Sequence, residues 1–431
     1  MVNYYNPGIF QEKPRPDWLT IILFLILSTF GVLNVFSAST SIDDAVFWDI
    51  SKNHGKQLIF MAVALGIGFF FMLLTPTFFH ITSYGIYAVV IGLLVLVLVI
   101  GTTIAASKSW ISIGSFRLQP AEFAKYATVL AIAKYLDGYG ISFKGYRNIG
   151  ICMTFVGLPF LLTLAQNDTG SALVFFSFVL VFFREGMPGY ILVMGLWVVL
   201  LFILSIIFDN YFHSYTIAIG IVALGAIAAF VLRRYKKALL LVFLIVVGSL
   251  AINVGVNFFF NKVLKQYQRD RILVTLNLKE DKMGIGYNVN QSKIAIGAGQ
   301  LTGRGFMQGT QTLMGFVPEQ STDFIFCTIG EEWGFIGTAS MIIIYLVFMG
   351  RILFLAERQR TTYSRVVGYG LFSILLMHFF INIGMTLGIV PVIGIPLPFF
   401  SYGGSSFIAF TVLLFTFLSL DSKRIFEMVR G

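Results

Sequence analysis

The chain has 431 residues, of which 57% are hydrophobic and 12% are charged, and its formal net charge is +10. Soluble domains are roughly half apolar and a quarter charged, so this composition excludes an ordinary soluble globular protein. It is typical of a protein that crosses a membrane many times, because lipid-facing helices can expose so much hydrocarbon without cost.

Apolar runs long enough for membrane helices follow one another along the whole chain. We expect an all-α, polytopic helical membrane protein with about twelve transmembrane helices, from windows of about nineteen residues. The expected spans are 18–37, 57–75, 82–102, 120–136, 149–166, 170–183, 188–208, 215–232, 237–258, 323–350, 366–389 and 400–420. The two cysteines and four histidines are scattered among them and predict neither a disulfide framework nor a metal cage.

The distribution of Lys and Arg orients these spans. Seventeen fall on segments that share a side with the N-terminus, and only four fall on the short loops of the other side. Because cytoplasmic loops are enriched in Lys and Arg, we expect cytoplasmic tails at 1–17 and 422–431. The loop 259–322 is then extracytoplasmic. The net charge is explained as an orientation signal, so no nucleic-acid partner is expected.

This long loop is polar, rich in glycine and set between apolar runs. Arg269 and Arg271 near its start suit a phosphate or pyrophosphate through bidentate hydrogen bonds, although contact with lipid headgroups is an equal alternative. Lys293 and Arg304 add further positive charge. Asp281 stands among these cations. From the residues alone it is either a turn residue or a catalytic carboxylate.

Polar side chains within or beside the spans are further candidates, since such groups are costly in a membrane. Glu122 and Lys125 lie on one face of a single helix, where they can lock helix packing as an ion pair or contact substrate. Gln119 directly precedes this helix. Asp168 lies in a short external turn and either caps the next helix or serves the substrate.

The C-terminal part of the chain combines carboxylates with breaks in the helical pattern. Asp323 is expected to cap its span, and Glu331 and Glu332 follow two turns later, pointing in different directions. Prolines in 391–398 and the polar run 401–406 then interrupt the pattern at membrane depth. Irregular backbone there must be buried in protein or line a wet cavity, so we expect a cavity at the external ends of the last two spans.

Several of these segments, in this order, resemble the signature of the SEDS (shape, elongation, division and sporulation) glycosyltransferases. The similar segments are 114–125, 266–269, 281–287, 291–292, 294–297, 309–311, 318–319, 322–326, 331–332, 382–385 and 396–405. The resemblance covers almost the whole chain, and 309–311 is more similar to the RodA branch than to the FtsW branch. The family usually has ten spans, so 188–235 is interpreted as a two-helix insertion in a single membrane domain, 18–421.

The resemblance implies polymerisation of lipid II into peptidoglycan glycan strands at the outer face of the bacterial cytoplasmic membrane, for cell-wall elongation and shape. Asp281 would act as general base on the 4-hydroxyl of the acceptor GlcNAc, which attacks the MurNAc anomeric carbon with inversion. Undecaprenyl pyrophosphate would leave, neutralised by a divalent cation (Mg²⁺ or Mn²⁺) or by the basic residues. The implied partners are a class B penicillin-binding protein (a transpeptidase), other cell-wall elongation proteins and membrane lipids.

The resemblance, together with the residue patterns, assigns two further groups of side chains. Those expected to bind lipid II and its pyrophosphate are Arg117, Gln119, Asp168, Arg269, Arg271, Gln291, Ser292, Lys293, Arg304, Ser401 and Ser405. Those expected to support the site are Glu122, Lys125, Glu331 and Asn382. No metal ligands are assigned. The alternatives are a lipid II flippase or transporter, a division-specific SEDS polymerase, and a non-catalytic scaffold.

Overall fold

The computed structural model describes residues 15–40, 46–104, 107–114, 116–139, 146–211, 215–279 and 284–424. Asp281 lies outside these ranges. Within them, nine helices are long and apolar enough to cross a membrane. The other three predicted spans correspond to shorter helices, namely α4, α9 and the broken helix α6–α7. The predicted polytopic helical architecture is therefore confirmed.

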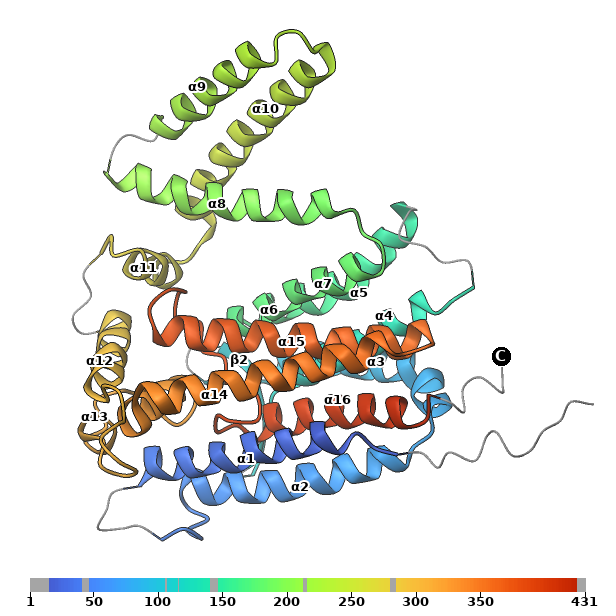
Figure 1. Cartoon of the computed structure of the whole chain (residues 1–431), viewed down its shortest axis with the longest axis vertical. Coiled ribbons are helices and arrows are strands. Elements are labelled where there is room, and N and C mark those ends of the chain that lie inside the picture. Colours follow the sequence, from blue (N-terminus) through green and yellow to red (C-terminus); the bar gives the residue numbers. More distant parts are fainter. Residues whose placement is uncertain are drawn as a thin grey trace, which may run out of the picture. The chain divides into compact units, whose positions relative to one another are not determined.

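The helices form two compact units, and the first holds residues 1–186, 291–387 and 393–431. Its α16 packs against α2, while α14 packs against α1 and α15 (Figure 1). Every residue of α16 from Ser405 to Asp421 is buried, so this helix forms the centre of the unit. The helices are α1 (Trp18–Ser39), α2 (Asn53–Leu73), α3 (Pro76–Ile100), α4 (Pro120–Leu136), α5 (Tyr146–Ala165), α6 (Thr169–Val174), α7 (Phe178–Arg184), α13 (Thr310–Leu313), α14 (Ile325–Glu357), α15 (Thr362–Thr386) and α16 (Gly404–Ser422).

Polar side chains begin several of these helices. Asp17 accepts hydrogen bonds from the backbone and hydroxyl of Thr20 and from the guanidinium of Arg351, which ties the start of α1 to α14. Burial alone raises the pKa of Asp17, but these hydrogen bonds outweigh it and lower the pKa to about 2. Thr75 and Thr361 cap α3 and α15 in the same manner. Such caps satisfy N–H groups that have no partner within the helix.

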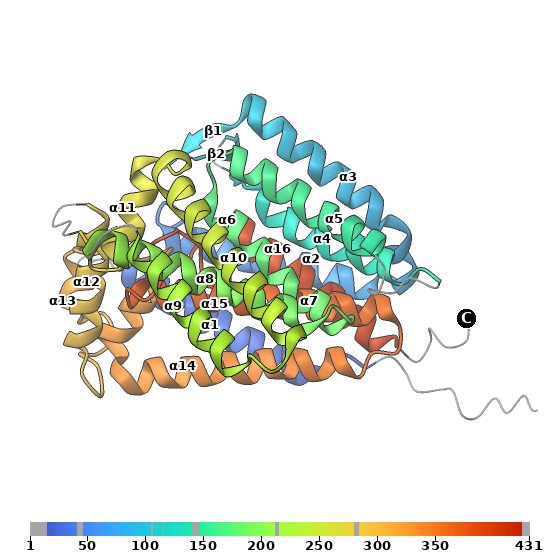
Figure 2. The same ribbon diagram turned by 90° about the horizontal axis from the view of Figure 1, so that it is seen from above.

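A small antiparallel sheet, absent from the all-α prediction, connects α3 to α4. It consists of β1 (Thr102–Ile104), β2 (Ser107–Ile113) and β3 (Phe116–Leu118), in that spatial order. Figure 2 shows β1 and β2 at the end of α3. Gly114, with a φ of 62°, lies between β2 and β3, where most other residues would be strained. These strands replace part of what was predicted as an irregular external loop.

Helix α14 contains a break that binds a preceding loop. Gly334 has φ 65° and ψ −160°, far from helical values. The helix carbonyls of Glu331 and Glu332 there accept hydrogen bonds from the backbone of Arg304 and Gly305, at 3.0 Å each. Asp323, predicted to cap this span, does not do so: the helix begins at Ile325, and a turn at 321–324 places Asp323 one residue too early.

The second unit holds residues 187–290 and 388–392, and thus includes the predicted insertion 188–235. Its helices are α8 (Gly189–Tyr211), α9 (Thr216–Val231), α10 (Lys236–Phe258), α11 (Gln266–Thr275) and the first part of α12 (Ile285–Ala298), with a π-helical turn at Phe259–Val263. Trp197 of α8 donates to Ser249 of α10 at 3.0 Å, and Ser205 donates to Asn253 on the same pair of helices. Polar pairs of this kind hold membrane helices together.

Candidate functional site

Gln119 and Asp168, predicted separately, meet at the junction of α4 and α6. The Gln119 side-chain Nε2 donates to Asp168 Oδ2 at 2.6 Å and to the Ser171 hydroxyl at 3.3 Å. Asp168 also accepts from the backbone N–H of Ser171 at 3.0 Å and is the N-cap of α6. The predicted capping role is thus confirmed, while its role toward substrate stays a prediction. Ser171 was missed, although a hydroxyl three residues after an N-cap is a recognisable signal.

Ser405 and Arg117 extend this cluster from the other end of the sequence. The Ser405 hydroxyl donates to the carbonyl of Arg117 at 2.8 Å and accepts from the backbone N–H of Gln119 at 3.2 Å. Ser405 therefore joins the start of α16 to the start of α4. The Arg117 side chain is exposed.

The non-helical segment before α16 is held by buried polar groups. The Ser401 hydroxyl, expected to bind substrate, instead accepts from the backbone N–H of Leu397 at 2.9 Å. Gln57, which is 1% exposed, donates to the Ser401 carbonyl and accepts from the N–H of Gly403, both at 3.2 Å. Gln57 was missed because it is the first residue of the expected span 57–75 and directly follows the polar stretch 52–56, so it reads as part of a loop. A buried amide with two backbone partners fixes the shape of this turn.

Asn382 supports the same segment from α15. Its Nδ2 donates to the carbonyls of Asp323 and Ile395, at 2.9 and 2.8 Å. Asn382 is fully buried, so it does not face solvent. This geometry agrees with the expected supporting role, because it ties the start of α14 to the segment that leads to α16.

Glu331 is surrounded by donors from α13. Its carboxylate accepts from the backbone N–H groups of Gln311 and Thr312 at 2.8 and 2.9 Å and from the Thr312 hydroxyl at 2.7 Å. Arg304 donates to the Thr310 hydroxyl at 2.6 Å, which itself donates to Glu331 at 3.3 Å. A buried carboxylate with several donors is a strong anchor, so Glu331 positions the segment 304–312 rather than facing outward.

The neighbouring Glu332 points to a different partner, as the sequence predicted. It accepts from the Ser37 hydroxyl at the end of α1 and from the backbone N–H of Met307. Among the described residues it forms no ion pair. Glu331 thus attaches the segment 304–312 to α14, and Glu332 joins the same segment and α14 to the end of α1.

Glu122 and Lys125 form the predicted ion pair inside the first unit. The Lys125 ammonium donates to both carboxylate oxygens of Glu122 at 2.8 Å, and both side chains are at most 2% exposed. The ammonium also lies 2.8 Å from His378 Nε2, and His378 Nδ1 donates to the Pro396 carbonyl at 3.1 Å. His378 is fully buried and connects the ion pair to the segment before α16.

The remaining predicted cations are exposed or lie in the second unit. Arg269 lies over the Phe260 ring at 5.4 Å and contacts Asn261, while Arg271 lies over the Tyr267 ring at 5.8 Å. Both are only partly exposed. Aromatic contact of this kind holds a guanidinium in place, and guanidinium groups suit anionic ligands.

Three predicted residues lie on the part of α12 that belongs to the first unit. Ser292 is fully buried and its hydroxyl donates to the Thr386 carbonyl at 3.0 Å, so it attaches α12 to α15. Gln291 is half-buried, and Lys293 is exposed. Of the three, Lys293 and Gln291 are accessible to a ligand, whereas Ser292 serves packing.

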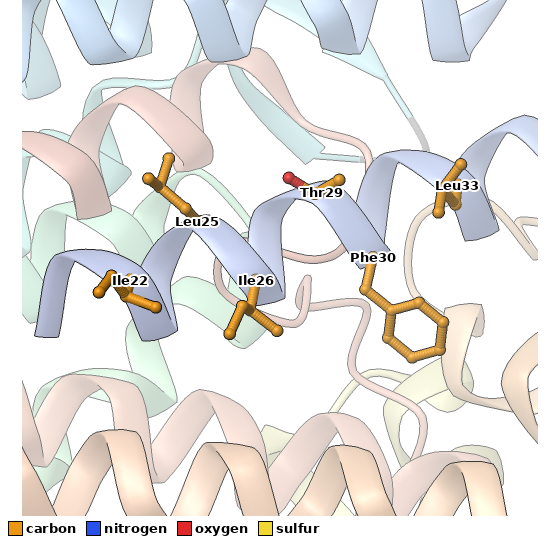
Figure 3. A pocket seen from close by; sticks show the side chains of 6 residues that line it. All are labelled: Ile22, Leu25, Ile26, Thr29, Phe30 and Leu33. Atoms are coloured by element: carbon orange, nitrogen blue, oxygen red, sulfur yellow. The ribbon is translucent and has the colours of Figure 1, made fainter. Parts of the chain in front are cut away.

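An apolar groove of about 410 Å³ runs along α1 (Figure 3). It is lined by Ile22, Leu25, Ile26, Thr29, Phe30 and Leu33. None of these residues belongs to the polar cluster described above. The groove faces hydrocarbon by its composition and contains no group that could carry out acid–base chemistry.

The part of the chain that the structure describes contains no group of three His, Cys, Asp or Glu side chains that could hold a metal ion. Asp168 and Glu331 each have their oxygens occupied by protein donors. The divalent cation expected from the family resemblance stays a prediction. The described residues form a cluster of hydroxyl, amide and carboxylate groups beside the exposed guanidinium of Arg117.

The chain is similar to a known protein family and to proteins within it. The model of the FtsW/RodA/SpoVE family, described as a cell cycle protein, matches residues 17–219 and 217–424. The chain is similar to the peptidoglycan glycosyltransferase MrdB of Escherichia coli (strain K12), at 31% identity over 98% of both chains. It is 30% identical to the peptidoglycan glycosyltransferase RodA of Treponema pallidum (strain Nichols), over 95% of this chain and 98% of the relative.

A solved structure described as showing structural coordination of polymerization and crosslinking by a peptidoglycan synthase complex matches with a TM-score of 0.70. The sequence identity is 25%, and the match covers 95% of this chain and 98% of the solved chain. The arrangement of helices is thus similar over nearly the full length of both chains.

Proposed function

The chain belongs to the FtsW/RodA/SpoVE family, and on this premise we propose that it is a peptidoglycan glycosyltransferase of the RodA type. It polymerises lipid II into glycan strands for cell-wall elongation and cell shape. The observation that carries the proposal is the match over almost the full length of both chains to relatives named as peptidoglycan glycosyltransferases. A polytopic membrane fold suits a substrate that is anchored to a lipid.

In the proposed reaction Asp281 accepts the proton of the acceptor GlcNAc 4-hydroxyl. A bond then forms between that oxygen and the anomeric carbon of the donor MurNAc, as the bond from this carbon to the pyrophosphate oxygen breaks. One displacement inverts the anomeric configuration and requires one general base and no protein nucleophile. The proton ends on the Asp281 carboxylate and the electron pair on the departing undecaprenyl pyrophosphate.

The negative charge of the leaving pyrophosphate requires cations near the reacting sugars. Arg117 is exposed beside the cluster of Gln119, Asp168 and Ser405, and we assign it to this role. The other proposed cations are Arg269, Arg271, Lys293 and Arg304. Guanidinium groups bind phosphate oxygens in pairs, which gives direction as well as charge. A divalent cation, Mg²⁺ or Mn²⁺, would add positive charge beside the pyrophosphate, and polymer formation with and without EDTA tests this separately.

The proposed chemistry requires a defined sidedness. We propose that both termini are cytoplasmic and that the loop bearing Asp281 faces outward, as the excess of Lys and Arg on the other side indicates. A class B penicillin-binding protein is the proposed partner, since crosslinking must follow polymerisation. The similarity to a chain from a peptidoglycan synthase complex supports this partner.

The decisive experiment gives labelled lipid II to the purified full chain in detergent and measures polymer on gels. We expect glycan polymer from the natural chain and a loss of at least about a hundredfold in rate for Asp281→Asn, because general-base catalysis is worth roughly that much. The matched control is Asp270→Asn, the same chemical change in the same loop. Asp270 pairs with Lys279 near the surface, so polymerisation should stay within a few-fold of the natural rate.

Full activity in Asp281→Asn would remove Asp281 from the mechanism. Movement of lipid II across vesicle membranes by the natural chain, without any polymer, would instead identify a flippase. A chain that neither polymerises nor translocates, alone or with its transpeptidase partner, would be a scaffold.

A further inference from the structure

Four cations gather at the turn between α9 and α10. Residues 233–237 read Arg-Arg-Tyr-Lys-Lys, and all five are exposed. We call this segment the basic turn; Figure 1 shows it at the tip of the α9–α10 hairpin. Arg233 lies over the Phe230 ring at 4.8 Å. Among the described residues, none of its four cations takes part in an ion pair.

The basic residues at helix ends of the first unit differ, because the protein itself uses many of them. Their ion pairs are Arg184–Glu357, Arg351–Asp17, Arg358–Asp421 and Arg365–Glu185. Lys423 donates to the backbone carbonyls of Met72 and Leu74. In these places the positive charge stabilises contacts between helices. Among the described residues, the cations of the basic turn form no ion pair that would stabilise a contact between helices.

Helix stability does not account for the two lysines of the basic turn either. Lys236 and Lys237 lie in the first turn of α10, and Tyr235 at the N-cap makes no side-chain capping bond. Cations at a helix N-terminus are opposed by the helix dipole, so these two lysines weaken the helix end on which they lie. An anionic ligand bound at this helix end would offset the unfavourable interaction between the two lysines and the helix dipole.

The helix that precedes the basic turn indicates where that ligand lies. Helix α9 has 16 residues and no buried side chain, so its apolar surface must face lipid. At 1.5 Å per residue it is about 24 Å long, which is shorter than the ~30 Å hydrocarbon core of a bilayer. A short span draws its ends to the level of the lipid headgroups. Tyr235, which is 68% exposed, has the ring and hydroxyl typical of interfacial aromatic residues, and Phe230 beside it is 66% exposed.

We propose that the basic turn binds the headgroups of anionic phospholipids. The guanidinium groups of Arg233 and Arg234 can each bind a phosphate through two N–H donors. Lys236 and Lys237 add positive charge beside them. Clusters of four or more cations directly beside a membrane helix have this preference. The site is on the predicted insertion and the start of α10, and it does not depend on the proposed polymerase activity.

The test uses the purified full chain, with phosphatidylglycerol and phosphatidylcholine titrated separately and bound lipid counted by native mass spectrometry. We expect selective retention of phosphatidylglycerol that weakens as salt is raised. The neutral variant changes Arg233, Arg234, Lys236 and Lys237 to Gln and should lose about tenfold or more in affinity for phosphatidylglycerol. The matched variant exchanges Arg for Lys and Lys for Arg at the same positions. It keeps the charge and should retain most of the affinity.

Equal affinity in the natural and neutral chains would overturn the proposal, as would equal retention of the two lipids. If the charge-keeping variant loses as much as the neutral one, shape rather than charge matters and the proposal also fails. A neutral variant that does not fold leaves the salt dependence and lipid selectivity of the natural chain as the deciding measurements. Binding of an acidic protein or RNA at the basic turn that displaces no phosphatidylglycerol would show a different class of partner and reject the lipid site.

Discussion

Inside the first unit, one lysine connects two helices and the segment before α16. Lys125 of α4 pairs with Glu122 on its own helix and contacts His378 of α15, whose other ring nitrogen binds the carbonyl of Pro396. Three residues of separation on one helix predict the ion pair, because positions i and i+3 lie on one face. The contact with His378, 253 residues away, has no such local signal.

We predict that Lys125→Met lowers the free energy of unfolding by about 3–5 kcal/mol, because it leaves the Glu122 carboxylate buried without a partner. The double variant Glu122→Gln with Lys125→Met should lose clearly less, since it leaves no buried charge. Thermal unfolding of the four chains in detergent forms a double-mutant cycle.

The control for this cycle is Lys279→Met, which breaks a partly exposed ion pair with Asp270 and should cost about 1 kcal/mol or less. Equal losses in the single and double Glu122–Lys125 variants would show that the pair contributes nothing beyond side-chain volume.

The sequence identifies candidate binding residues, but it does not show whether their side chains contact a ligand or the protein itself. Ser401 and Ser292 were expected to contact substrate, yet both hydroxyls bond to the backbone in buried positions. Arg117 and Lys293 remain exposed. Whether a polar side chain faces a ligand or the protein depends on the segment that packs over it, which a single stretch of sequence does not contain.

At the scale of elements, the loop after α12 fits into the break of α14. Phe335 and Ile336 donate their backbone N–H groups to the carbonyls of Gln300 and Leu301, at 2.9 and 3.0 Å. A Cβ on Gly299 would lie 1.9 Å from the carbonyl oxygen of Gly330, so the backbones approach too closely for any side chain. Glycines in this loop permit close approach of another backbone, but the sequence does not identify the helix that approaches.

We predict opposite effects for two alanine substitutions that are two residues apart. Gly299→Ala should destabilise the chain by about 1–3 kcal/mol or more, because the new methyl group forces α14 and the loop apart. Gly297→Ala lies within α12 with open space around it, and it should stabilise the helix by about 0.5–1 kcal/mol.

Thermal unfolding of both variants, with polymerisation measured in parallel, checks this pair of predictions. If Gly299→Ala unfolds at the same temperature as the natural chain, the close approach to Gly330 is not a constraint on the fold.

The small sheet shows where prediction of elements from hydropathy ends. Within β2, apolar and polar residues alternate only over 111–113, so the strand pattern is short. The segment was assigned to a loop, since windows of about nineteen residues average such a short signal away. The same averaging explains why the broken helix α6–α7 was predicted as one continuous span.

At the scale of the whole molecule, the proposed sidedness rests on charge counted over the loops. The two native cysteines are buried, at 0% and 1% exposure, so they give little background in labelling experiments. Tyr139 is fully exposed on a segment predicted to be cytoplasmic, and Met314 is 68% exposed in the loop predicted to face outward.

We predict that Met314→Cys is labelled by a membrane-impermeant maleimide in intact spheroplasts, whereas Tyr139→Cys is labelled only after the membrane is opened. The physical reason is that segments rich in Lys and Arg are retained in the cytoplasm during insertion. The opposite pattern would place the Asp281 loop inside the cell and remove the basis for an external polymerase.

The sequence alone determined that this is a helical membrane protein, which segments cross the membrane, and which family it belongs to. Hydrophobicity and charge act as sums over neighbouring residues, so they can be read along the chain. Only the tertiary structure decided which polar groups meet: Gln119 with Asp168 across 49 residues, and Ser405 with Arg117 across 288. Such contacts depend on how distant helices pack, and packing is a property of the assembled chain.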